Sequence, residues 1–77
     1  MSIEVLTDDK IAEAVLTLLD TPKRLVELRK ELRRKGILVS YTRLKKIMDV
    51  LVGQGHVSCF KYGKAVMYIK KELLTQN

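Results

Sequence analysis

The stretch from Gly36 to Val57, GILVSYTRLKKIMDVLVGQGHV, is the most informative part of this 77-residue chain about its fold. It begins with a short apolar connector, after which Ser40 is suited to cap a helix over about residues 40–54. Four large apolar residues recur at helical spacing on one face of this helix: Leu44, Ile47, Met48 and Leu51. Gly55 then stops the helix directly before a strand. The stretch therefore predicts a helix with one buried face, followed by a β-strand.

Two further helices are predicted upstream, over about residues 8–19 and 22–35. In the second, Thr21 is the expected cap and Pro22 the first helical residue, where its missing N–H is not needed. Gly36 is the expected left-handed residue at its end. Both helices carry an apolar stripe, formed by Ile11, Ala14, Val15 and Leu18 in the first and by Leu25, Leu28 and Leu32 in the second.

The last segment, about residues 56–70, alternates in the manner of a β-hairpin. A two-residue turn at Tyr62-Gly63 or at Gly63-Lys64 would join its strands. Either turn places one set of side chains on each face of the hairpin: Val57, Cys59, Val66 and Tyr68 on one, Phe60, Met67 and Ile69 on the other. A lone cysteine cannot form a disulfide within the chain, so we expect Cys59 to be a small buried strand residue, the alternative being a disulfide between two chains.

Five motifs follow one another along the chain: Leu25-x-x-Leu28-x-x-x-Leu32, Gly36-Ile37-Leu38-Val39-Ser40, Leu44-x-x-Ile47-Met48-x-x-Leu51, Gly53-Gln54-Gly55-His56-Val57 and Met67-Tyr68-Ile69. In this order, residues 21–69 resemble the winged helix-turn-helix family of DNA-binding domains. The resemblance implies an α+β fold, a three-helix winged helix-turn-helix with a C-terminal β-hairpin wing. We expect residues 1–77 to form a single domain of this kind.

Charge is distributed unevenly along the sequence. Residues 1–20 hold one basic residue against five acidic ones, whereas residues 21–46 hold ten basic residues against two acidic ones. The formal net charge is +6. This polarity favours a polyanion that meets one side of the molecule, although a solvated helix face would also carry lysine and arginine.

The resemblance implies that the third helix enters the major groove and that the wing reaches phosphate or the minor groove. Arg43 is expected to contact guanine, and Lys45 and Lys46 to contact phosphates. Tyr41 either flanks the core or donates its hydroxyl to the DNA backbone. The full set of expected DNA contacts comprises Ser40, Tyr41, Thr42, Arg43, Lys45 and Lys46 on the third helix, Lys23, Lys30 and Arg34 on the second, and Lys61 and Lys64 on the wing.

No catalytic or metal-binding set is apparent in the sequence. His56 and Cys59 supply two ligands where a structural zinc site needs four, and their spacing points them to opposite faces of a strand. We therefore expect no enzymatic activity, no cofactor or metal and no small-molecule ligand. No apolar run is long enough to span a membrane, and the start lacks the pattern of a signal peptide. A cytoplasmic location is the expectation.

The leading hypothesis is a double-stranded DNA-binding protein that regulates transcription as a homodimer. A dimer is inferred from the broadly apolar first helix, the apolar residues before it (Ile3, Val5 and Leu6) and the terminal Leu73-Leu74. The alternative is a winged-helix protein–protein interaction module within a larger nucleic-acid-processing assembly. Such a module would dock through Phe60, Met67 and Ile69.

Overall fold

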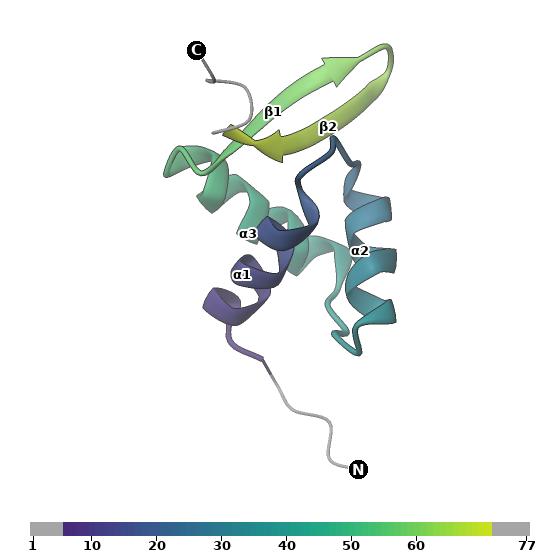
Figure 1. Cartoon of the computed structure of the whole chain (residues 1–77), viewed down its shortest axis with the longest axis vertical. Coiled ribbons are helices and arrows are strands. Elements are labelled where there is room, and N and C mark those ends of the chain that lie inside the picture. Colours follow the sequence, from purple (N-terminus) through teal and green to yellow (C-terminus); the bar gives the residue numbers. More distant parts are fainter. Residues whose placement is uncertain (1–5, 72–77) are drawn as a thin grey trace.

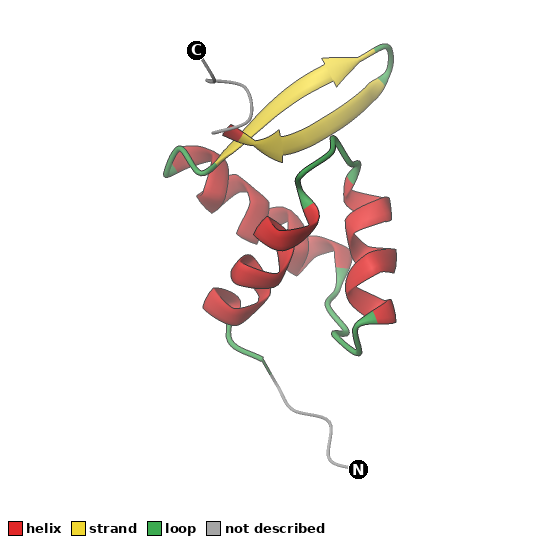
Figure 2. Ribbon diagram, viewed as in Figure 1, coloured by secondary structure: helices red, strands yellow, loops and turns green. Residues whose placement is uncertain are grey.

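The computed structural model describes residues 6–71 of the chain. Three helices are followed by an antiparallel hairpin: α1 (Asp8–Leu18), α2 (Leu25–Arg34), α3 (Tyr41–Gly53), β1 (Val57–Tyr62) and β2 (Ala65–Lys70). The hairpin crosses one end of the helical group, and its turn projects beyond the helices (Figures 1 and 2). This order confirms the predicted three helices and C-terminal hairpin. Four of the apolar residues behind the dimer inference, Ile3, Val5, Leu73 and Leu74, lie outside the described residues.

Side-chain caps begin α1 and α3 close to the predicted positions. The Thr7 hydroxyl accepts the N–H of Lys10 at 3.3 Å, and the Ser40 hydroxyl accepts the N–H of Arg43 at 3.2 Å. Each cap satisfies one of the backbone donors that the first turn of a helix leaves without a partner. The two helices therefore start where the sequence offers a hydroxyl.

The predicted start of the second helix is wrong by three residues. Its cap is Arg24, whose N–H donates to the Glu27 carboxylate at 3.0 Å, and Thr21 and Pro22 precede the helix. The backbone hydrogen bond from Arg24 lowers the pKa of Glu27. Gly36 ends α2 as expected, with a φ of +84° and a bond from the N–H of Ile37 to the Leu32 carbonyl.

Lys23 is held outside α2 because it pairs with the hairpin. The N–H of Lys23 donates to the Tyr68 carbonyl at 3.0 Å, and the N–H of Tyr68 donates to the Lys23 carbonyl at 2.8 Å. These two bonds form an isolated antiparallel bridge beside β2. A helix that began at Pro22 would remove both bonds, so the tertiary pairing overrides the local helix signal.

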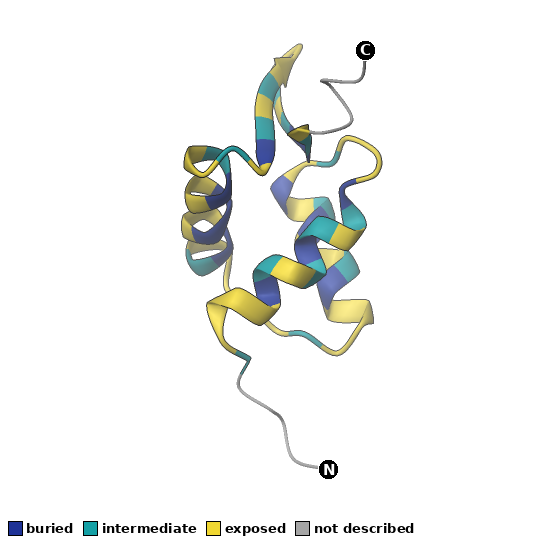
Figure 3. Cartoon of the chain, turned by 60° about the vertical axis from the view of Figure 1, so that its left-hand side comes forward, coloured by how far each residue is buried: buried dark blue, intermediate teal, exposed yellow. Residues whose placement is uncertain are grey.

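One continuous core joins the three helices to the inner face of the hairpin. Val15, Leu28, Leu32, Leu44 and Met48 are fully buried. Dark blue residues in Figure 3 face inward on the helices and at the base of the hairpin. The remaining members of the core are Ile11, Leu19, Leu25, Val39, Ile47, Leu51, Val57 and Tyr68. No helix in residues 6–71 is both long enough and apolar enough to cross a membrane.

The register of the hairpin selects the second predicted turn. Tyr62 pairs with Ala65, which leaves Gly63 and Lys64 as the two-residue loop. Gly63 has a φ of +63°, and no residue other than glycine has a positive φ in the described chain. Positive φ at the first loop position alone is typical of a type II′ turn, whose twist suits a hairpin.

The predicted faces of the hairpin are confirmed, but their burial differs from expectation. Val57 and Tyr68 are buried, whereas Cys59 on the same face is exposed. The expectation of a buried cysteine is wrong because, at this level of the hairpin, the cross-strand partner Tyr68 on β2 enters the core and Cys59 on β1 does not. On the outer face Ile69 is only 8% exposed, so the surface suggested for protein docking retains just Phe60 and Met67, both half-buried.

Candidate nucleic-acid interface

The face of α3 opposite the core is exposed and mainly polar, although Val50 on it is also 55% exposed. Lys45, Lys46 and Asp49 lie on it with Thr42, and the buried residues Leu44, Ile47, Met48 and Leu51 occupy the other side of the helix. At 3.6 residues per turn, the polar residues project from successive turns of the same surface. The sequence correctly predicted this division of α3.

Two lysines on this surface differ in their surroundings. Lys45 Nζ lies 2.7 Å from Asp49 Oδ1, and this hydrogen bond raises the pKa of Lys45. The Lys46 side chain is exposed and makes no hydrogen bond or ion pair with another residue in 6–71. The carboxylate is therefore already neutralised by Lys45, and Lys46 contributes one uncompensated positive charge.

Arg43 is directed to α1 and not outward. Its Nε donates to Asp8 Oδ1 at 2.8 Å, and its Nη2 donates to the Leu6 carbonyl at 2.9 Å. The predicted guanine contact is therefore not supported by this geometry, because the guanidinium already joins α3 to the start of α1. Helical spacing placed Arg43 at the edge of the exposed face but could not show that α1 lies beside that edge.

The start of α3 offers fewer free groups than expected. The Ser40 hydroxyl is engaged as the helix cap. Tyr41 is 49% exposed and is not among the described residues that pack against the core, so the first of its two predicted positions is wrong. The second, a hydroxyl donated to the DNA backbone, stays a prediction. The Tyr41 side chain is accessible on the surface beside Ser40.

The tip of the wing is basic and accessible. Lys61, Tyr62 and Lys64 are all exposed, and Tyr62 is 76% exposed. Lys61 pairs with Val66 in the register, so it shares a face with Cys59 and Tyr68. This is the face from which Tyr68 enters the core. The exposed lysines of the wing therefore place positive charge beyond the helices, and Lys61 lies on the same face of the hairpin that packs against the helices.

The basic residues predicted for the second helix divide into one that binds within the protein and two that are exposed. Lys23, predicted as a phosphate contact on α2, precedes that helix, and its Nζ donates to the Leu18 carbonyl at 2.7 Å and to Thr21 Oγ1 at 2.8 Å. It stabilises the end of α1. Lys30 and Arg34 do face solvent from α2, Arg34 with a loose pairing to Glu31 at 3.5 Å.

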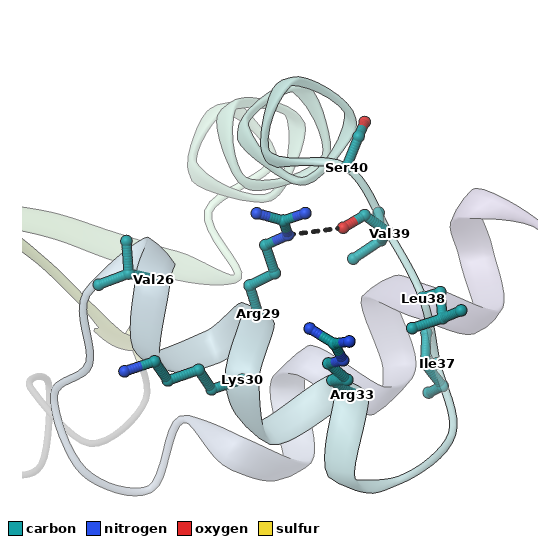
Figure 4. Close-up of a pocket in the computed structure, with 8 residues that line it drawn as sticks. All are labelled: Val26, Arg29, Lys30, Arg33, Ile37, Leu38, Val39 and Ser40. Atoms are coloured by element: carbon teal, nitrogen blue, oxygen red, sulfur yellow. Dashed lines mark hydrogen bonds between the residues drawn. The ribbon is translucent and has the colours of Figure 1, made fainter.

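Sequence reasoning missed a groove between α2 and the connector that follows it. The groove has a volume of about 620 Å³, and Figure 4 shows Arg29 and Arg33 directed into it from α2. Arg29 Nε donates to the Val39 carbonyl at 3.0 Å and so holds the connector in place. The signal available in the sequence was the spacing of Val26, Arg29 and Arg33 on one flank of α2.

Comparison with solved structures identifies the fold that holds these residues. The chain is similar to FurB from M. tuberculosis, a zinc uptake regulator, with a TM-score of 0.71 and 24% identity over 82% of this chain. The fold is a winged helix. The winged helix spans 52% of the FurB chain, so it corresponds to about half of that regulator.

A second solved structure supports the same fold. It is that of HOP2, described for its DNA recognition and protein interaction domains and for homologous DNA pairing. The TM-score is 0.66 and the identity 19%, over 82% of this winged helix and 95% of the HOP2 chain. No protein-family model and no curated protein matches the chain by sequence.

Residues 6–71 contain no group of three or more His, Cys, Asp or Glu side chains able to hold a metal ion. The chemistry that this part of the winged helix presents is instead cationic. It consists of lysines and arginines on α2, α3 and the wing, with few carboxylates among them.

Proposed function

We propose that this winged helix binds double-stranded DNA, with α3 in the major groove and the wing on phosphate or the minor groove. The observation that carries the proposal is the exposed face of α3, where Asp49 is neutralised by Lys45 and Lys46 has no partner in the described chain. A helix of this kind fits the major groove, where a donor such as Lys46 reaches base edges or phosphates. Thr42 lies one turn before Lys46 and reaches the same groove.

Phosphate contacts come from three places around this helix. Lys61 and Lys64 on the wing are exposed beyond the helices, and Lys30 and Arg34 face solvent on α2. At α3 itself, Lys45 exchanges Asp49 for a phosphate when DNA is bound. The backbone N–H groups at the start of α3, beside Ser40 and Tyr41, form a further anion site. Arg43 and Lys23 are left out, because both already bind within the protein.

The proposed biological role is transcriptional regulation by a homodimer inside the cell. One small module makes few DNA contacts, and two-fold pairing doubles them. The similarity to FurB supports a regulator, since that protein is a zinc uptake regulator. The similarity to HOP2 supports a role on DNA more generally.

The test compares DNA affinity as a function of salt for wild type, Lys46→Glu and Lys10→Glu. Lys10 lies on α1 and not on the proposed surface of α3. Its variant is a matched control, because Lys10→Glu changes the net charge by the same amount as Lys46→Glu. We expect wild-type binding with a log–log salt slope equivalent to about 4–8 neutralised phosphates. Lys46→Glu should abolish this binding, and Lys10→Glu should retain it.

Equal affinities of the two variants would overturn the placement of α3 in the groove. Absence of wild-type binding at low salt would overturn DNA binding itself. The protein-interaction alternative would then be examined through Phe60 and Met67, the half-buried pair on the outer face of the hairpin.

A further inference from the structure

The groove beside α2 combines positive charge with exposed apolar surface. Arg29, Lys30 and Arg33 line it, and none of them has a carboxylate partner among residues 6–71. Val26 and Leu38 also line it and are 45% and 63% exposed. The Arg29 guanidinium is held by Val39, so one cation is already oriented toward the groove (Figure 4).

These properties favour a protein occupant over a nucleic acid. A DNA backbone would pair with Arg29 and Arg33 but would gain little from Val26 and Leu38, whose burial is favourable only against another apolar surface. The matching surface carries carboxylates and an apolar side chain at helical spacing. The chain itself has such a surface.

The outward face of α1 is that surface. Asp9, Glu13 and Leu16 fall on one stripe of the helix. The two acids are exposed, and Leu16 is half-buried because one side of it packs against the core. Asp9 has no ion pair within the described residues, and Glu13 has only a loose one with Lys10 at 3.8 Å. This stripe is acidic where the groove is basic.

The spacing of the two surfaces is complementary as well as their charge. Along α2, Val26 is followed by Arg29 and Arg33, three and seven residues later. Along α1, Leu16 is preceded by Glu13 and Asp9, three and seven residues earlier. Each set covers about 10 Å at 1.5 Å per residue. Laid antiparallel, the helices bring all three pairs together.

We propose that α1 of a second copy of this chain docks antiparallel along the α2 groove. Leu16 then covers Val26, Glu13 pairs with Arg29, and Asp9 pairs with Arg33. The contact joins two different surfaces, so the two-fold pair proposed above forms when each copy's α1 lies in the other copy's groove. A single contact is heterologous and leaves one groove and one α1 stripe free. This interaction does not depend on DNA.

The test is a charge exchange followed by sedimentation analysis without DNA. We expect wild type to self-associate in a salt-sensitive manner. Arg33→Glu and Asp9→Lys should each weaken self-association about tenfold or more, because each places like charges opposite one another. An equimolar mixture of the two variants should form mixed pairs with affinity near that of wild type. In these pairs the carboxylate introduced at position 33 of one copy meets the ammonium introduced at position 9 of the other.

Lys35→Glu is the matched control, since Lys35 lies at the end of α2 outside the groove and its change alters the net charge as Arg33→Glu does. Circular dichroism checks that each variant is folded. Absence of wild-type self-association up to about 1 mM, or no recovery in the mixture, overturns the proposal. If Arg33→Glu instead weakens DNA binding while self-association is absent, the groove belongs to DNA. Failure of Lys46→Glu to weaken DNA binding would overturn the placement of α3 in the major groove, but it would not bear on self-association through the α2 groove.

Discussion

Arg43 on α3 holds Asp8 at the first turn of α1, with its Nη2 2.8 Å from the carboxylate Oδ1. The same guanidinium reaches the Leu6 carbonyl at 2.9 Å. Two segments separated by 35 residues are thereby joined at the edge of the proposed DNA-binding face. The guanidinium that the sequence predicted to contact guanine instead connects α3 to α1.

Arg43→Met is expected to lower the free energy of unfolding by about 1 kcal/mol, because a partly exposed ion pair and a hydrogen bond to a carbonyl are both lost. Urea denaturation measures this change. Lys46→Met is the matched control and should leave stability unchanged while weakening DNA binding far more than Arg43→Met does. A larger loss of DNA affinity in Arg43→Met than in Lys46→Met would return Arg43 to the DNA contacts.

Lys23→Met is expected to destabilise the fold without changing how DNA binding depends on salt. Its Nζ makes hydrogen bonds to the Leu18 carbonyl and to Thr21, whose loss costs about 0.5–1.5 kcal/mol. Lys30→Met should do the reverse, lowering the salt slope by about one phosphate with little effect on stability. Finding that Lys23→Met lowers the salt slope would restore Lys23 as a phosphate contact.

Gly36→Ala is expected to lower stability by about 1 kcal/mol, because a φ of +84° is unfavourable for a residue with a Cβ. No atom lies within 4 Å of the position that the Cβ would take, so backbone conformation alone accounts for the cost. Gly53→Ala provides the contrast, since Gly53 is helical and equally open. That variant should gain about 0.5 kcal/mol. Thermal unfolding of both variants checks the prediction, and a shift in the same direction would contradict it.

Stability is expected to fall above about pH 10, where an ordinary tyrosine ionises. Burial raises the pKa of Tyr68 in the folded chain. The unfolded chain therefore loses this proton first as the pH rises, and unfolding becomes more favourable. Tyr68→Phe should flatten the alkaline decline measured by urea titration between about pH 9 and 11. Tyr62→Phe removes a 76% exposed phenol and should leave the decline as in wild type. Parallel curves for all three proteins would show that Tyr68 is not responsible.

Local signals in the amino-acid sequence were enough to place the elements and most of their ends. Apolar residues at helical spacing predicted the buried faces of the three helices, and Ser40, Gly36 and Gly63 marked a cap, a helix end and a turn. These signals are local, because a cap or a positive φ involves residues only a few positions apart. For the same reason the exposed lysines of α3 were predicted correctly as a surface.

Which charges are free depended on the packing of the elements and could not be predicted along the chain. Lys23 was assigned to a helix, but pairing of its backbone with Tyr68 holds it outside α2, and its side chain binds the end of α1. Arg43 was assigned to DNA although α1 lies beside it, and Cys59 was assigned to the core although only its cross-strand partner Tyr68 enters the core. Each outcome depends on contacts between residues distant in sequence, and periodicity along one element contains no information about the element that packs against it.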